Sequence, residues 1–180
     1  MKHINKYITE KLTISNKSNK KTTYTLFPKD KLELLKIIEK EIKQNGNECN
    51  LNHIDTSEIT NMSYLFDRSN FNGDISQWNV SNVINMSFMF SDSLFNNDIF
   101  DWDVSNVTNM FGMFYQSKFN SDISRWDVSN VDSMMNMFDD SKFNQDISEW
   151  NINKYCQTIE MFKKCNIKDE YKPFQDGTRI

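Results

Sequence analysis

Residues 95–118 read FNNDIFDWDVSNVTNMFGMFYQSK, and this stretch sets the pattern for most of the chain. The same pattern recurs at 71–94, 119–142 and 143–166, with a period of 24 residues. A period of this length indicates stacked structural units in which each unit contacts its neighbours. The aromatic columns of the repeat are Trp78, Trp102, Trp126 and Trp150, and Phe66, Phe90, Phe114, Phe138 and Phe162.

Each repeat combines two local patterns. Its Trp-Asp-Val-Ser segment is short and partly β-branched, which favours a brief strand. Its Asn-Met-x-x-Met-Phe segment places apolar residues at i, i+3 and i+4, which favours one or two helical turns. A single unit cannot bury its own apolar side chains, whereas stacked units can. The sequence therefore predicts an α+β fold, a solenoid of about five strand-plus-short-helix coils with the Trp, Phe and Met columns in its core.

The Trp-Asp-Val-Ser-Asn-Val and Met-x-x-Met-Phe motifs resemble the BspA-type leucine-rich-repeat family of bacterial proteins, which includes many surface proteins and lipoproteins. The resemblance covers about residues 50–166. It implies a leucine-rich-repeat-like solenoid that is used for binding, and it implies no particular activity. The last coil departs from the motif at Tyr155, Cys156, Gln157 and Thr158.

Three segments are expected along the chain. Residues 1–49 are predicted to form an N-terminal cap, residues 50–166 the repeat solenoid, and residues 167–180 a C-terminal cap or tail. In the N-terminal cap, 4–14 and 22–27 are expected to pair as a β-hairpin. An amphipathic helix is expected to begin near Pro28 and Asp30 and to end at Gly46. Its apolar stripe is predicted from Leu32, Leu35, Ile38 and Ile42.

Charge is distributed unevenly between these segments. Residues 1–46 carry 11 lysines and five acidic residues, a net charge of +6. Residues 47–150 have a net charge of -12, and residues 151–180 a net charge of +2. No apolar run is long enough for a membrane helix, and no signal peptide is recognisable, so we expect a cytoplasmic protein. A surface location is the alternative if an export signal has been removed.

The polar columns have a structural explanation. Asp74, Asp98, Asp122 and Asp146 recur at the period of the repeat, as a calcium ladder would require, but the unit is not glycine-rich. We interpret these aspartates as turn residues that accept backbone N–H groups. Three cysteines and two histidines at irregular spacing predict neither a disulfide framework nor a zinc site. We therefore expect no metal, no cofactor and no catalytic residue, and an enzyme is not expected.

Positions at which the repeats differ are the candidates for a binding surface. Core columns stay constant from repeat to repeat, so variable apolar residues are expected to face outward. Exposed aromatic side chains and methionine are common anchors of protein interfaces. The predicted partner-binding residues are Tyr64, Phe88, Phe100, Phe111, Tyr115, Met135, Asp92 and Asp101.

The leading functional hypothesis is a non-enzymatic protein-binding module that acts through the acidic surface of the solenoid. Its partner is expected to be a protein with a basic face. No nucleic acid is expected to bind the solenoid, because the acidic surface repels phosphates. One alternative is a phage-encoded inhibitor of a nucleic-acid-dependent bacterial defence nuclease, and another is a surface adhesin-type repeat protein. The sequence leaves the oligomeric state open.

Overall fold

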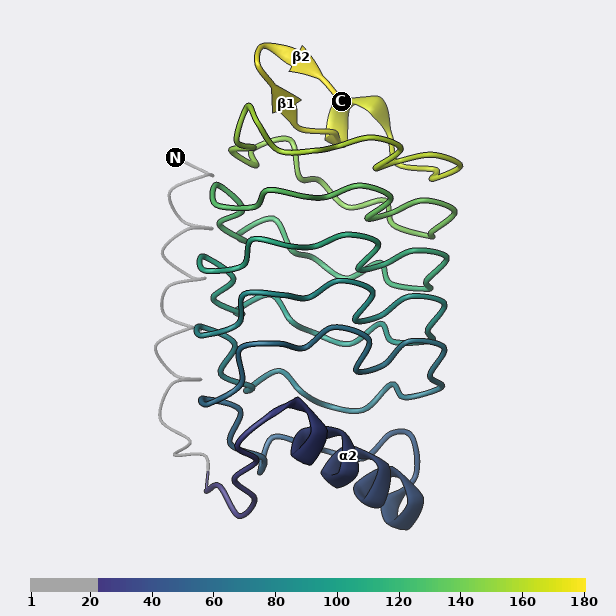
Figure 1. The fold of residues 1–180 in the computed structure, drawn as a ribbon. Helices are drawn as coiled ribbons and strands as arrows, with labels where there is room; N and C mark the ends of the chain where they lie inside the picture. Colours follow the sequence, from purple (N-terminus) through teal and green to yellow (C-terminus); the bar gives the residue numbers. More distant parts are fainter. Residues whose placement is uncertain (1–22) are drawn as a thin grey trace, which may run out of the picture.

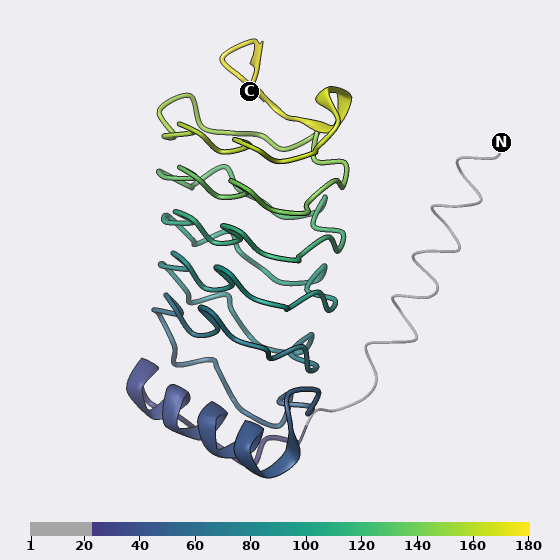
Figure 2. The ribbon, with the colours of Figure 1, turned by 90° about the vertical axis from the view of Figure 1, so that its right-hand side faces the viewer.

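The computed structural model describes residues 23–180, which form a stack of similar coils between a helix and a β-hairpin (Figure 1). The regular elements are α2 (Lys31–Asn45), the 3-10 helix η1 (Asp169–Tyr171), β1 (Phe174–Gln175) and β2 (Thr178–Arg179). We number the coils 1 to 5, at 51–74, 75–98, 99–122, 123–146 and 147–170. The coils lie one above another with α2 beneath coil 1 (Figure 2).

Parallel backbone pairing joins each coil to the next. Single bridges link the equivalent positions Asn61, Asn85, Asn109, Ser133 and Gln157. Hydrogen bonds flank each bridge in both directions, as when Met86 N donates to Asn109 O at 2.9 Å and Thr108 N donates to Ile84 O at 3.0 Å. Because the pairing repeats at the period of the sequence, equivalent side chains lie above one another.

Aromatic columns fill the interior of the stack. The four tryptophans are 3–4% exposed, and Phe90, Phe114 and Phe138 are completely buried. Equivalent rings stack, with a centroid distance of 5.7 Å between Phe90 and Phe114. The indole Nε1 of Trp102 donates to the carbonyl of Ile75 in the preceding coil at 3.3 Å, so the polar atom of the ring is also satisfied. The predicted burial of these columns is confirmed, except that the last member, Phe162, is half-buried.

The helical turns predicted for Asn-Met-x-x-Met-Phe are wrong. The segment forms two consecutive tight turns in each coil, as when Met113 N donates to Met110 O and Ser117 N donates to Phe114 O, both at 3.2 Å. The third residue of the first turn has a positive φ, which fits a type II turn and excludes a right-handed helix. These residues form a column, Tyr64, Phe88, Gly112, Asn136 and Glu160, with φ between 54° and 60°. A second column, Arg68, Asp92, Gln116, Asp140 and Lys164, is also left-handed.

The brief strands predicted at Trp-Asp-Val-Ser are wrong as well. In coils 2 to 4 this segment is irregular, and the bridges between coils fall instead on the residue before the first methionine. Asx turns interrupt the extended stretches: Ser105 N donates to the Asp103 carboxylate at 3.2 Å, and Phe111 N donates to the Asn109 side chain at 2.9 Å. With a corner every few residues, no stretch of a coil is long enough for a strand.

The N-terminal helix is close to its predicted bounds. Asp30 caps α2 by accepting a hydrogen bond from Glu33 N, and Gly46 with φ 84° ends it. Its buried residues are Leu34 and Ile38, whereas Leu32 of the predicted stripe is 60% exposed. The helix packs on coil 1 through a face rotated from the predicted one. The predicted hairpin partner 4–14 lies outside the described residues.

The opposite end of the stack is covered by the C-terminal residues. Phe174 of β1 forms a parallel bridge with Asn151 of coil 5, and β1 then pairs with β2 as an antiparallel hairpin. Tyr171 accepts a hydrogen bond from Ile147 N at 3.0 Å. Both ends of the described stack are therefore paired with flanking chain.

Candidate protein-interaction surface

One apolar side chain per coil lies on the corner formed by the first tight turn. We call this set the apolar ridge: Tyr64, Phe88, Phe111, Met135 and Ile159. The rings of Tyr64 and Phe88 stack at 5.1 Å, and Phe111 meets Phe88 edge-on at 4.9 Å. Met135 and Ile159 continue the column of Phe111, and Ile159 is 64% exposed. The structure thus brings together four of the predicted partner-binding residues.

The ridge changes column between coils 2 and 3, and Gly112 permits the change. A Cβ atom at Gly112 would lie 2.5 Å from Cε1 of Phe88, so only glycine leaves room for that ring. In coils 1 and 2 the ridge residue is the third residue of the turn, and in coils 3 to 5 it is the second. Tyr64 and Phe88 are bulky residues with φ of 60° and 54°, a conformation that glycine or asparagine adopts at lower cost.

Exposed polar side chains, four of them charged, form a second column one turn further along each coil. We call it the edge column: Arg68, Asp92, Gln116, Asp140 and Lys164. Its charges read +, −, 0, −, + from coil 1 to coil 5. Gln116 donates to the carboxylate of Asp140 at 3.2 Å, which connects the centre of the column. Sequence reasoning found Asp92 alone among these residues, although the shared column positions would have indicated the others.

The remaining predicted residues lie elsewhere. Phe100 lies in a different turn, at the start of coil 3, where its backbone N–H donates to the Asp98 carboxylate at 3.0 Å. Its ring lies 4.7 Å from the guanidinium carbon of Arg125. Its neighbour Asp101 is exposed on that turn. Tyr115 is half-buried beside the ridge, and its carbonyl accepts a hydrogen bond from Asp92 N at 2.7 Å. The sequence could not separate these positions, because repeat variability reveals exposure and not the side of the coil.

The N-terminal helix contacts the first ridge residue. Lys31 Nζ donates to Ser63 Oγ at 2.9 Å and lies 5.6 Å from the centre of the Tyr64 ring. Partial burial lowers the pKa of the Lys31 ammonium. This contact fixes the position of the helix relative to the ridge and places a positive charge at the coil 1 end.

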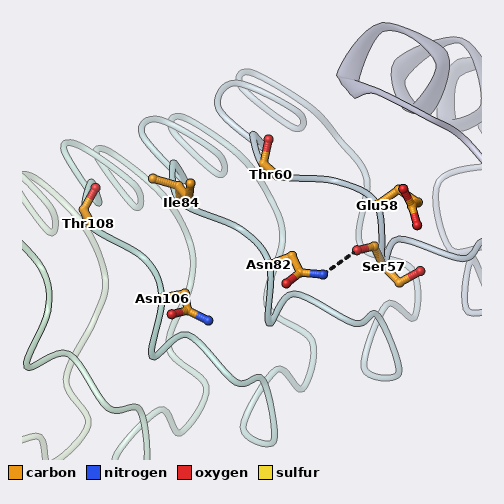
Figure 3. A pocket seen from close by; sticks show the side chains of 7 residues that line it. All are labelled: Ser57, Glu58, Thr60, Asn82, Ile84, Asn106 and Thr108. Atoms are coloured by element: carbon orange, nitrogen blue, oxygen red, sulfur yellow. Dashed lines mark hydrogen bonds between the residues drawn. The ribbon is translucent and has the colours of Figure 1, made fainter.

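An open groove lies on the face that precedes the ridge. Its volume is about 570 Å³, and its lining side chains come from coils 1 to 3 in two rows, as Figure 3 shows: Ser57, Glu58, Thr60, Asn82, Ile84, Asn106 and Thr108. Asn82 Nδ2 donates to Ser57 O at 2.8 Å, and Asn106 repeats this bond to Ser81 O. The asparagines therefore brace neighbouring coils. Both side chains are exposed.

The aspartate columns act as turn residues. Ser76 N, Ser124 N and Ser148 N donate to the carboxylates of Asp74, Asp122 and Asp146 at 2.9–3.0 Å. The interpretation of these aspartates as acceptors of backbone N–H groups is confirmed. Among residues 23–180, no cluster of three or more histidine, cysteine or acidic side chains could hold a metal ion.

Calcium is therefore expected to leave the melting temperature unchanged. A bound ion would stabilise the folded state by mass action. The comparison is a melting curve in EDTA against one in millimolar calcium. A calcium-dependent rise of several degrees would contradict the turn account of the aspartate columns.

Acid is expected to destabilise the coils through the Asx turns. The hydroxyl and the backbone N–H of Ser129 donate to Asp127 and lower the pKa of its carboxyl. A lowered pKa in the folded state stabilises the protein above the unfolded value of about 3.9, and this stabilisation is lost as the pH falls through the folded pKa. Asp127→Asn should make the loss between about pH 5 and pH 2 shallower. Asparagine is a suitable control, since Asn79 accepts the equivalent bond from Ser81 N in coil 2. Identical pH profiles for the two proteins would contradict this assignment.

The cysteines of the described residues are free thiols, and two of them have a raised pKa. Burial raises the pKa of the Cys49 thiol, and it raises that of Cys156 to about 11. His53 Nε2 lies 3.7 Å from the Glu41 carboxylate of α2. A thiol with a raised pKa contains little thiolate at neutral pH, so it is a poor nucleophile.

Comparisons with known proteins give one family. Residues 36–118 and 95–171 match the family described as "Mycoplasma protein of unknown function, DUF285". No curated protein and no solved structure matches the chain. In the part of the chain that the structure describes, no helix has the length and apolarity needed to cross a membrane. Because the two matches together span residues 36–171, the chain belongs to the family of Mycoplasma proteins of unknown function known as DUF285.

Proposed function

We propose that the chain is a non-enzymatic, protein-binding repeat module: a BspA-type, leucine-rich-repeat-like solenoid that holds its partner on the apolar ridge. The ridge is the observation that carries this proposal. Its aromatic rings are in contact over coils 1 to 3, and Met135 and Ile159 hold the equivalent position in coils 4 and 5. Its first ring is 51% exposed, and its members are not needed to fill the core, which the Phe and Trp columns fill. Contiguous apolar surface rimmed by polar groups is typical of protein-interaction sites.

Charge supports a protein partner with a basic face. The net charge of residues 47–150 is -12, and Asp92 and Asp140 are exposed in the turn that follows the ridge turn. Opposite charge on a partner accelerates association and makes it sensitive to salt.

The test compares two matched variants in a capture experiment from the native host. The double variant Phe111→Ala/Met135→Ala removes the centre of the ridge, and Leu94→Ala removes an apolar side chain that is 48% exposed outside the ridge. We expect a captured protein that wild type and Leu94→Ala retain and the ridge variant loses, while the melting curves show that both variants are folded at the temperature of the capture. Equal retention by all three proteins would contradict a role of the ridge.

A second candidate function is inhibition of a nucleic-acid-dependent nuclease by occupation of its basic groove. The observation that favours it is the net charge of -12 over residues 47–150. In this case the chain should displace DNA from the captured nuclease without binding DNA itself, since its surface repels phosphates. A shift of labelled DNA by the chain alone would contradict this candidate.

A further inference from the structure

The spacing of the ridge identifies the shape of its partner. Successive ring centres lie 5.1 Å and 4.9 Å apart, from Tyr64 to Phe88 and from Phe88 to Phe111. An α-helix presents one turn of side chains every 5.4 Å, whereas a strand presents side chains on one face about every 6.7 Å. Four steps along the stack, from coil 1 to coil 5, the side chains of a partner helix would be out of register with the ridge by about 2 Å. Those of a partner strand would be out of register by about 7 Å. The ridge is therefore commensurate with a helix that lies along the axis of the stack.

Flanking chain occupies one backbone position at each end of the described stack. Leu26 forms a parallel bridge with Ile54 at the first coil, and Phe174 forms one with Asn151 at the last. Strand addition, the usual way of binding an extended peptide, requires an unpaired edge. A strand added at an end coil would pair with its backbone and would not cross the other coils, so recognition along the whole ridge is by side-chain packing.

The edge column specifies charges on the partner. Asp92 and Asp140 lie two coils apart, about 10 Å by the spacing of the ridge rings. Positions i and i+7 of a helix share one face and are about 10.5 Å apart. Two basic residues at this separation can therefore face the two carboxylates at once.

A second copy of the chain does not fit this pattern. In an antiparallel pair centred on Phe111, Arg68 would face Lys164 and Asp92 would face Asp140. In a parallel two-fold pair the two edge columns would lie on opposite sides of the contact and could not pair with each other. Like charges meet in the antiparallel arrangement and no opposite charges meet in the parallel one, which disfavours self-association.

We propose that the apolar ridge binds an amphipathic α-helix of a partner protein, laid along the stack axis, with basic residues at i and i+7 facing Asp92 and Asp140. This inference rests on the proposed protein-binding function. It adds the secondary structure, direction and charge pattern of the partner. The apolar face of the helix contacts Tyr64 through Ile159, and its basic edge contacts the edge column.

The test uses designed peptides of about 18 residues, a length of about 27 Å as a helix. The first has leucines at i, i+3, i+4 and i+7 spacing and lysines seven residues apart on the adjoining face. The second replaces these lysines by glutamate. The third has the composition of the first with leucines in alternation, so that it presents its apolar face as a strand. Titration calorimetry gives the affinities, and circular dichroism follows helix formation.

We expect the first peptide to bind with a gain of helix and the other two to bind at least on the order of tenfold more weakly. Phe111→Ala should weaken binding of the first peptide by on the order of tenfold, and Leu94→Ala should leave it unchanged. Asp92→Lys/Asp140→Lys should reverse the preference between the first two peptides. Equal affinity for the helical and alternating peptides, or no effect of Phe111→Ala, would overturn the inference.

Two outcomes separate this inference from the proposed function. Failure of the helical peptide to bind, with ridge-dependent capture of a host protein intact, would overturn the helical partner alone. Failure of both experiments would overturn the binding function as well. Sedimentation should give a monomer, and a dimer that Phe111→Ala dissociates would show that a second copy occupies the ridge, contrary to the proposal.

Discussion

Replacing Trp126 by alanine is expected to lower the free energy of unfolding by about 3–5 kcal/mol. The side chain is 3% exposed and lies between Phe114 at 6.3 Å and Trp150 at 6.5 Å, so its removal leaves a cavity inside the stack. Its Nε1 also donates to Ile99 O at 3.1 Å, a contact between coils 3 and 4 that alanine cannot make. Coil 4 is stabilised by the coils on either side of it, so the substitution weakens its contact with both neighbours.

Chemical denaturation provides the measurement for Trp126→Ala. Tyr155→Ala is the matched control, since this aromatic side chain belongs to the repeat region but is 77% exposed. We expect the control to change stability by less than about 0.5 kcal/mol. A loss below about 1 kcal/mol for Trp126→Ala would contradict the stacked tryptophan core.

Gly73→Ala is expected to cost about 3 kcal/mol through overpacking. A Cβ atom at this position would lie 2.7 Å from Cε2 of Phe71 and clash directly with the backbone oxygen of Cys49. A backbone oxygen cannot rotate away as a side chain can, so the chain entering coil 1 would have to shift. The equivalent positions Asn97, Ser121 and Gln145 carry side chains, which identifies the approach of Cys49 as specific to the first coil.

The control for this substitution is Gly177→Ala. Gly177 has a positive φ of 78° and no atom within 4 Å of the added Cβ, so alanine there adds backbone strain without a clash. This strain costs roughly 1 kcal/mol. Equal losses for the two variants in thermal or chemical unfolding would show that coil 1 adapts to the Cβ at Gly73, against the present account.

The core could be predicted from the sequence because its columns are invariant. Burial of Trp102 and Phe114 follows directly from a period at which like residues stack. The turns could not be predicted in the same way. In Met-x-x-Met-Phe the spacing of i, i+3 and i+4 fits a helix and also fits two successive turns. The difference lies in the hydrogen bonds, which run to the next coil, as from Phe90 N to Met113 O, and periodicity does not report them.

The ridge was only partly visible in the sequence. Phe88 and Phe111 stand in different columns, so an inspection by column separates residues that the structure brings to 4.9 Å. The connection depends on the missing side chain of Gly112, which leaves room for the Phe88 ring. Phe100 shows the opposite case. It also departs from the residue type of its column, but it lies in another turn, beside Arg125 and away from the ridge turn.

We infer that each coil keeps its core column separate from a ridge residue that is available for binding. Phe111 and Phe114 test it within one coil, because the first is half-buried on the ridge and the second is completely buried. The measurement is the free energy of unfolding of Phe111→Ala beside that of Phe114→Ala. The account predicts a loss of about 3–5 kcal/mol for Phe114→Ala and about 1 kcal/mol for Phe111→Ala, which loses its edge contact with Phe88. Equal losses for the two variants would place Phe111 in the core and contradict the ridge.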